Sequence, residues 1–98
     1  MIKVTPAKVK SLNEGKNLVT KQMQAKAGQL LPKHMATVES ALVVVKGECA
    51  LMLGKEEHIL GQGSSMVIPA EVWHQIKATE DFTAIHIMPK GIKFEFSD

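Results

Sequence analysis

Two stretches decide the fold: GQLLPKHMATVESALVVVKG, residues 28–47, and GSSMVIPAEVWHQIKA, residues 63–78. Each begins at a glycine, and polar and apolar residues alternate along much of each stretch. Alternation with a period of two is typical of β-strands, because successive side chains of a strand point to opposite faces. We therefore predict strands over residues 37–46, 66–68 and 73–78, with a turn at residues 69–71.

Working outward from these stretches, we predict nine short strands, over residues 7–12, 18–24, 37–46, 48–53, 56–60, 66–68, 73–78, 82–88 and 92–96. No stretch of helical length keeps apolar residues at a 3.6-residue period. Many short strands separated by turn residues are typical of sandwiches and barrels. A chain of 98 residues has room for one domain, so we predict a single all-β barrel.

The predicted strand 37–46 is apolar on both faces. Its two alternating sets are Val38, Leu42 and Val44, and Ala41, Val43 and Val45. Strands of this kind are covered on both sides. One side faces the barrel interior, and we expect a second sheet or a second chain to cover the other. We therefore expect a homodimer, formed through residues 1–27 and the outer face around Val43.

Charge and aromatic content argue against several kinds of partner. All twelve basic residues are lysines, and the chain has no arginine and no tyrosine. The chain therefore lacks the bidentate donors that read bases and the aromatic platforms that stack on single strands, so we expect no nucleic-acid partner. No apolar run approaches the length of a membrane span, and no signal peptide is evident. The single cysteine, Cys49, fits a reducing compartment, so we expect a cytoplasmic protein without membrane contact.

Two histidines stand at fixed intervals from glycine and proline. The intervals are Gly28-x5-His34 and Gly63-x5-Pro69-x4-His74. Over residues 28–88 this spacing resembles the cupin family of small double-stranded β-helix (jelly-roll) barrels. The resemblance implies that residues 1–98 form one cupin-like domain, with its core in residues 28–88 and N-terminal strands in residues 1–27.

The resemblance also implies a site for a divalent transition metal, namely Mn, Fe, Ni, Cu or Zn. In the family's first motif a second histidine and then a glutamate follow the first histidine, but Ala36 and Ser40 stand at those positions here. His34 and His74 remain as metal ligands, and His86 is a further candidate. Catalytic zinc usually has three protein ligands, so the metal site implied by the motif is incomplete.

The interior of the barrel is the expected site. The residues predicted to line the pocket are His34, Ala36, Ser40, Met66, His74 and His86. Alternation along one strand would place His34, Ala36 and Ser40 on the same face. For residues 82–88 both alternating sets are apolar enough to face inward, so the side to which His86 points stays open.

Three functions are compatible with these features. In the first, the barrel binds a small polar molecule without a complete metal site, through His34, Ser40 and His74. In the second, His34 and His74 hold a metal in an enzyme resembling the cupin dioxygenases or isomerases. In the third, the barrel is a structural or regulatory homodimer. The incomplete ligand set favours a function without metal, and whether the chain is an enzyme stays open.

Overall fold

The computed structural model describes residues 3–97, which form ten β-strands and no helix. The strands are β1 (Lys8–Glu14), β2 (Leu18–Ala25), β3 (His34–Ala36), β4 (Ser40–Lys46), β5 (Cys49–Leu53), β6 (Glu56–Leu60), β7 (Ser65–Ile68), β8 (His74–Ala78), β9 (Phe82–Pro89) and β10 (Phe94–Phe96). The described residues thus contain no helix long and apolar enough to cross a membrane. The prediction of an all-β fold is confirmed.

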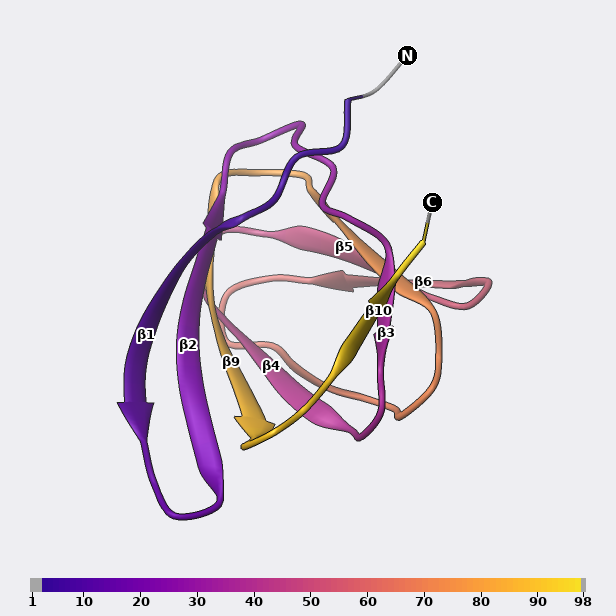
Figure 1. Cartoon of the computed structure of the whole chain (residues 1–98). Coiled ribbons are helices and arrows are strands. Elements are labelled where there is room, and N and C mark those ends of the chain that lie inside the picture. Colours follow the sequence, from indigo (N-terminus) through magenta and orange to yellow (C-terminus); the bar gives the residue numbers. More distant parts are fainter. Residues whose placement is uncertain (1–2, 98) are drawn as a thin grey trace.

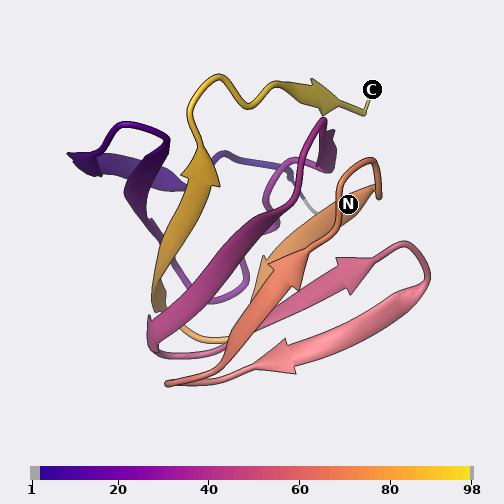
Figure 2. The same cartoon turned by 90° about the horizontal axis from the view of Figure 1, so that it is seen from below.

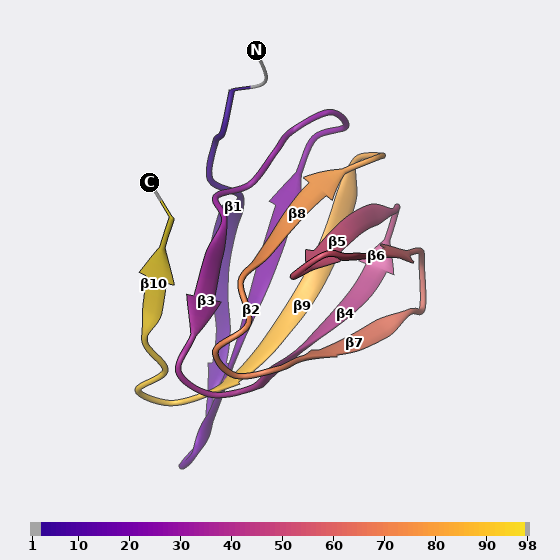
Figure 3. The ribbon, with the colours of Figure 1, turned by 90° about the vertical axis from the view of Figure 1, so that its right-hand side faces the viewer.

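The strands form two antiparallel sheets that face each other across the interior (Figure 3). One sheet has the order β1-β2-β9-β4-β7, and the other has the order β10-β3-β8-β5-β6. The β1–β2 and β5–β6 hairpins lie on opposite sides of the barrel (Figure 1 and Figure 2). Each sheet therefore offers one face to the interior, and the alternation along each strand decides which side chains lie there.

The core lies between the two sheets. Its most completely buried large side chains are Leu42 and Val44 of β4 and Cys49 and Leu51 of β5. Complete burial of a leucine or valine side chain stabilises a fold by about 1.5–3 kcal/mol. The inner face of β4 is therefore the set that contains Leu42 and Val44, and Ala41, Val43 and Val45 lie on its outer face, where Val45 is exposed.

The predicted strand 37–46 is wrong at its beginning. His34 belongs to β3 and Ser40 to β4, and these two strands lie in different sheets. The chain crosses between the sheets at residues 37–39, because the carbonyl of Ala36 accepts a hydrogen bond from the Glu71 amide and the amide of Thr37 donates to the Lys93 carbonyl. The alternation that was expected to link His34 to Ser40 is interrupted there.

A close approach of two backbone segments explains the glycine that ends β4. Gly47 has a φ of 81°, and a Cβ at this position would overlap the carbonyl oxygen of Asp81 and lie 2.9 Å from the Cα of Phe82. Only glycine adopts this conformation without a steric cost. The start of β9 packs closely against this turn for that reason.

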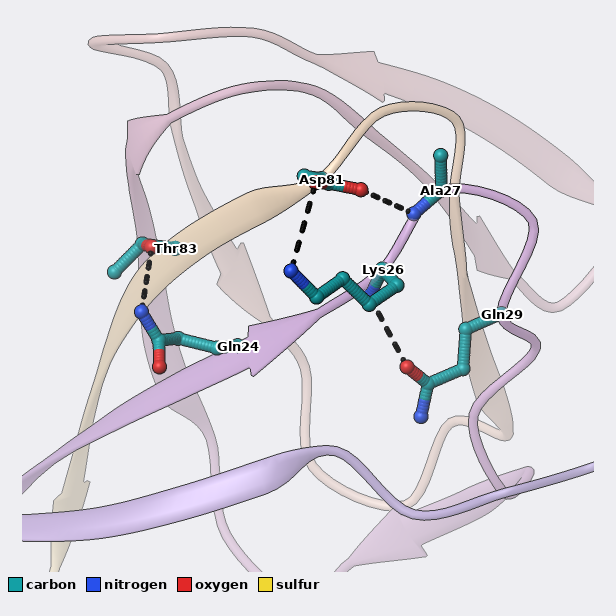
Figure 4. Close-up of polar contacts among 6 residues, drawn as sticks. All are labelled: Gln24, Lys26, Ala27, Gln29, Asp81 and Thr83. Carbon is teal, nitrogen blue, oxygen red and sulfur yellow. Dashed lines mark hydrogen bonds and ion pairs between the residues drawn. The ribbon is translucent and has the colours of Figure 1, made fainter.

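Asp81 also ties two loops together at the Ala25 end of β2 (Figure 4). Its Oδ1 accepts a hydrogen bond of 2.8 Å from the Ala27 amide, and its Oδ2 lies 3.8 Å from Nζ of Lys26. Beside it, Nε2 of Gln24 donates to Oγ1 of Thr83 over 3.2 Å. These contacts hold the β2–β3 connection against the beginning of β9.

Candidate functional site

A cavity of about 180 Å³ lies between the inner faces of the two sheets. Apolar side chains form most of its wall, among them Val9, Met23, Leu42, Ile68, Ile76 and Met88. Four polar side chains interrupt this wall: Lys21, His34, His74 and His86. An apolar cavity of about 150 Å³ is large enough to bind benzene, so this one has room for a molecule of about one ring and a substituent.

His34 and His74 lie directly opposite each other in the pairing of β3 with β8. Their ring centroids are 4.4 Å apart, with the edge of one ring toward the face of the other. Nδ1 of His34 is 3.2 Å from the carbonyl oxygen of Pro32, and Nδ1 of His74 is 2.9 Å from that of Val72. A carbonyl oxygen only accepts, so these contacts favour the neutral tautomer in which Nδ1 carries the proton and Nε2 carries a lone pair.

His86 comes from the inner face of β9. Its Nε2 shares a hydrogen bond of 2.8 Å with Oγ of Ser40, which is buried at the start of β4. Burial, joined by the neighbouring His34, His74 and Lys21, lowers the pKa of His86 to about 4.

Burial also lowers the pKa of His34 and of His74. For His34 the effect of burial is joined by the neighbouring His74, and for both rings the hydrogen bond to a backbone carbonyl acts in the opposite direction. The ordinary pKa of a histidine is about 6.5. All three imidazoles are therefore neutral at pH 7, and the cavity presents hydrogen-bonding groups rather than histidine charges.

Two aromatic rings of β10 stand at the mouth of the cavity. The ring centroids of Phe94 and Phe96 each lie 5.3 Å from that of His34. Both side chains are exposed, Phe96 to 60%, although both also line the cavity. These rings extend the apolar wall outward and hold one side of the His34 imidazole.

The structure brings His34, His74 and His86 to one cavity, whereas the other predicted pocket residues are not part of its wall. Ser40 is hydrogen-bonded to His86 behind the wall. Ala36 and Met66 do not line the cavity: Ala36 is buried at the end of β3, and Met66 packs against the core.

Sequence reasoning missed Lys21, Phe94 and Phe96 as cavity residues. The signal for Lys21 was the alternation Val19, Lys21, Met23 in the predicted strand 18–24, which places a lysine in an otherwise apolar set. Phe94 and Phe96 are also two residues apart, so their side chains share one face of a strand. Nothing in the sequence indicates that this strand, β10, pairs with β3 beside His34.

The residues present do not fit the metal site that the family motif implies. Within residues 3–97, no group of three or more His, Cys, Asp or Glu side chains is arranged to hold a metal ion. The motif's second histidine is replaced by Ala36, and its glutamate by Ser40, whose hydroxyl is engaged by His86. His34 and His74 alone fall short of the three protein ligands that are usual for catalytic zinc.

Two facing antiparallel sheets around a small interior cavity define the class of this protein: a β-barrel of jelly-roll type. The chain belongs to the cupin family, since the Cupin domain model matches residues 21–88. The resemblance found in the sequence is thereby confirmed. No curated protein matches the sequence.

Solved structures agree with this assignment. A cupin 2 domain-containing protein from Halorhodospira halophila is 18% identical, with a TM-score of 0.86 over 94% of this chain and 69% of that one. A Cupin 2 conserved barrel domain protein from Leptotrichia buccalis is 29% identical, with a TM-score of 0.77 over 86% and 41%. A mutant of the salicylate 1,2-dioxygenase from Pseudoaminobacter salicylatoxidans is 13% identical, with a TM-score of 0.84 over 93% and 30%. At identities of 18% and 13%, the first and third of these similarities concern the fold alone.

Proposed function

We propose that this barrel binds a small molecule in the cavity between its sheets, without a metal ion. The ligand is mostly apolar and carries a hydrogen-bond donor that the neutral imidazoles of His34 and His74 recognise. The observation that carries the proposal is the position of these two rings, whose Nδ1 atoms lie 3.2 and 2.9 Å from backbone carbonyl oxygens, which favours Nδ1–H donors and leaves two acceptor Nε2 atoms at an apolar cavity.

The apolar wall would supply most of the affinity, and the polar groups would supply the orientation. Small-molecule sites generally combine a mostly hydrophobic lining with a few fixed polar groups. Within residues 3–97 neither Nε2 has a protein donor. A ligand that offered no donor there would leave these acceptors without a partner, which disfavours binding.

The Nε2 atoms of His34 and His74 are also suited to ligate a metal ion, so a metal site is the alternative to metal-free binding of a small molecule. Histidines that ligate metals commonly donate their other ring N–H to a backbone carbonyl, as His34 and His74 do. A third ligand is what the site lacks, because His86 is bonded to Ser40 through its Nε2. We therefore propose no metal-dependent reaction for this chain, and binding measured with and without metal separates the two cases.

The test compares phenol with anisole, which differ in the hydroxyl proton, in the presence of excess EDTA. Phenol is expected to bind the wild-type protein measurably tighter than anisole, by calorimetry or by ligand-observed NMR. His34→Phe keeps an aromatic ring between Phe94 and Phe96 but removes the acceptor, so it should reduce this preference. His58→Phe, on β6 away from the cavity, is the matched control and should keep it. Binding that appears only after a divalent metal is added would contradict the proposal.

We also propose that a second copy of the chain covers the outer face of β4 and its neighbours. This face consists of paired residues that carry no charge: Ala41, Val43, Val67, Ile85 and Ile87. Val67 is exposed to 57%. In a twofold-symmetric dimer each subunit contributes the same patch to the interface. An uncharged patch therefore brings no like charges together.

Sedimentation velocity tests the dimer. The wild-type protein should sediment as a dimer, and Val43→Glu should sediment as a folded monomer because it brings two carboxylates together at the symmetric interface. Ile59→Glu places the same charge at an exposed isoleucine of β6 outside the patch and should remain dimeric. A monomeric wild-type protein at micromolar concentration would contradict this assignment.

A further inference from the structure

The inner face of the β1–β2–β9 side of the barrel carries a lysine. β2 alternates between Val19, Lys21, Met23 and Ala25 on one side and Thr20, Gln22 and Gln24 on the other. Ala25 is buried in the core and Met23 packs against it, so the set that contains Lys21 is the inner one. Lys21 accordingly lines the cavity together with Met23 and the three histidines.

The strand register puts Lys21 in a polar row that crosses this inner face. Lys21 is paired with Ser11 of β1 on one side and with His86 of β9 on the other. The next row toward Ala25 is apolar where it faces the interior, with Val9 opposite Met23 and Met23 opposite Ala84. Lys21 and His86, the polar residues that this sheet contributes to the cavity wall, thus lie side by side in one row.

The ammonium group of Lys21 has no acidic partner in the described part of the chain. The ion pairs found there join Lys26 to Asp81, His58 to Glu56 and Lys90 to Glu14. The three histidines of the cavity are neutral at pH 7, because burial lowers the pKa of each. Lys21 is therefore the charged group of the cavity wall, and an apolar wall strengthens its attraction for an anion.

We propose that the ligand carries a carboxylate and that Lys21 is its ion-pair partner in the cavity. This inference rests on the proposed function and adds the chemical class of the ligand: a small organic acid with an apolar body. A carboxylate carries one negative charge, which one ammonium group balances. A phosphate dianion would need more cationic donors than the cavity wall provides.

The arrangement also orients the acid. The Nε2 lone pairs of His34 and His74 would repel carboxylate oxygens, whereas they accept from a hydroxyl or an N–H group. The acid group would therefore lie at the β2–β9 wall beside Lys21, with the apolar body between the sheets. A donor on the opposite end of the molecule would face the β3–β8 pair.

The test uses benzoate and nitrobenzene, which have nearly the same shape, differ in charge and both lack a proton donor, with phenol as a probe of the cavity itself. Benzoate should bind the wild-type protein about tenfold or more tightly than nitrobenzene, since hydrogen bonds to charged groups are typically strong enough for such a ratio. Lys21→Met should remove this preference. Lys10→Met, on the outward side of β1, should keep the preference.

The outcomes separate the two proposals. If phenol binds but benzoate binds no tighter than nitrobenzene to the wild-type protein, the carboxylate assignment is overturned while the proposed function stands. An equal benzoate preference in wild type and Lys21→Met would overturn it as well. If none of the three probes binds, the proposed function fails and the carboxylate assignment fails with it. The wild-type comparison needs no variant, so a folding defect in Lys21→Met does not affect it.

Discussion

Acid should destabilise this protein through His86. The pKa of His86 in the fold is about 4, against about 6.5 for an unfolded histidine. The folded state therefore disfavours the protonated ring, and between these two values the unfolded chain binds the additional proton. Stability is fully present above about pH 6.5 and is lost as the pH falls toward about 4.

The magnitude follows from the same two values. The difference between about 6.5 and about 4 corresponds to about 3 kcal/mol of stability lost between about pH 7 and about pH 4. Small domains have about 5–15 kcal/mol in total, so this is a large part. The pKa values of His34 and His74 are lowered too, which adds to the loss in the same direction. Lys21, paired with His86 across the strands, contributes to the shift.

Urea unfolding followed by Trp73 fluorescence at a series of pH values measures this loss. His86→Gln keeps an amide that can bond to Ser40 but does not titrate, so its stability should fall by about 3 kcal/mol less than that of the wild type over the same range. His58→Gln is the control, because His58 lies outside the cavity, and it should lose as much stability as the wild type. Identical pH profiles for wild type and His86→Gln would refute the reasoning that His86 is buried and neutral.

Two further predictions concern the backbone. Gly47→Ala should destabilise the fold by about 3 kcal/mol or more, because its Cβ would overlap the Asp81 carbonyl, whereas Gly63→Ala has a similar φ of 85° with open space around it and should cost only about 1–2 kcal/mol. Equal losses in urea unfolding would show that the close approach at Gly47 is absent. Glu71 has a φ of 61°, a conformation that favours glycine, so Glu71→Gly should stabilise by about 0.5–1 kcal/mol and Glu71→Ala should not. A lower melting temperature for Glu71→Gly than for Glu71→Ala would contradict this.

The motif spacing predicted the fold because turns and strand ends are local features. The glycine that closes the first stretch, Gly47, has the positive φ that the turn requires, and so does Gly63 at the start of the second. Glu71, between Pro69 and His74, also has a left-handed backbone, a conformation that favours glycine. A positive φ at a turn restricts the residue type at that position, and this restriction does not depend on contacts with distant residues.

The site could be predicted only in part, because side-chain direction at several positions depends on pairing between distant strands. His86 lies in a strand whose two faces are both apolar, and its inward direction follows from its pairing with Lys21 and Leu42. The residue type of Lys21, taken without its strand neighbours, predicts a side chain exposed to solvent. The separation of His34 from Ser40 depends on two backbone hydrogen bonds, one donated by the Glu71 amide and one accepted by the Lys93 carbonyl, and both residues are remote in sequence.

The central claim is that His34 and His74 present neutral acceptor nitrogens to a small molecule in a metal-free cavity. Imidazole ¹⁵N NMR of the protein at pH 7 with excess EDTA tests this claim most directly. The ¹⁵N chemical shift of each ring nitrogen depends on whether that nitrogen carries the proton. We predict Nδ1–H tautomers for both rings, and Nε2 resonances that move when phenol is added. Protonation at Nε2, or Nε2 resonances that respond to phenol only after a divalent metal is supplied, would contradict it.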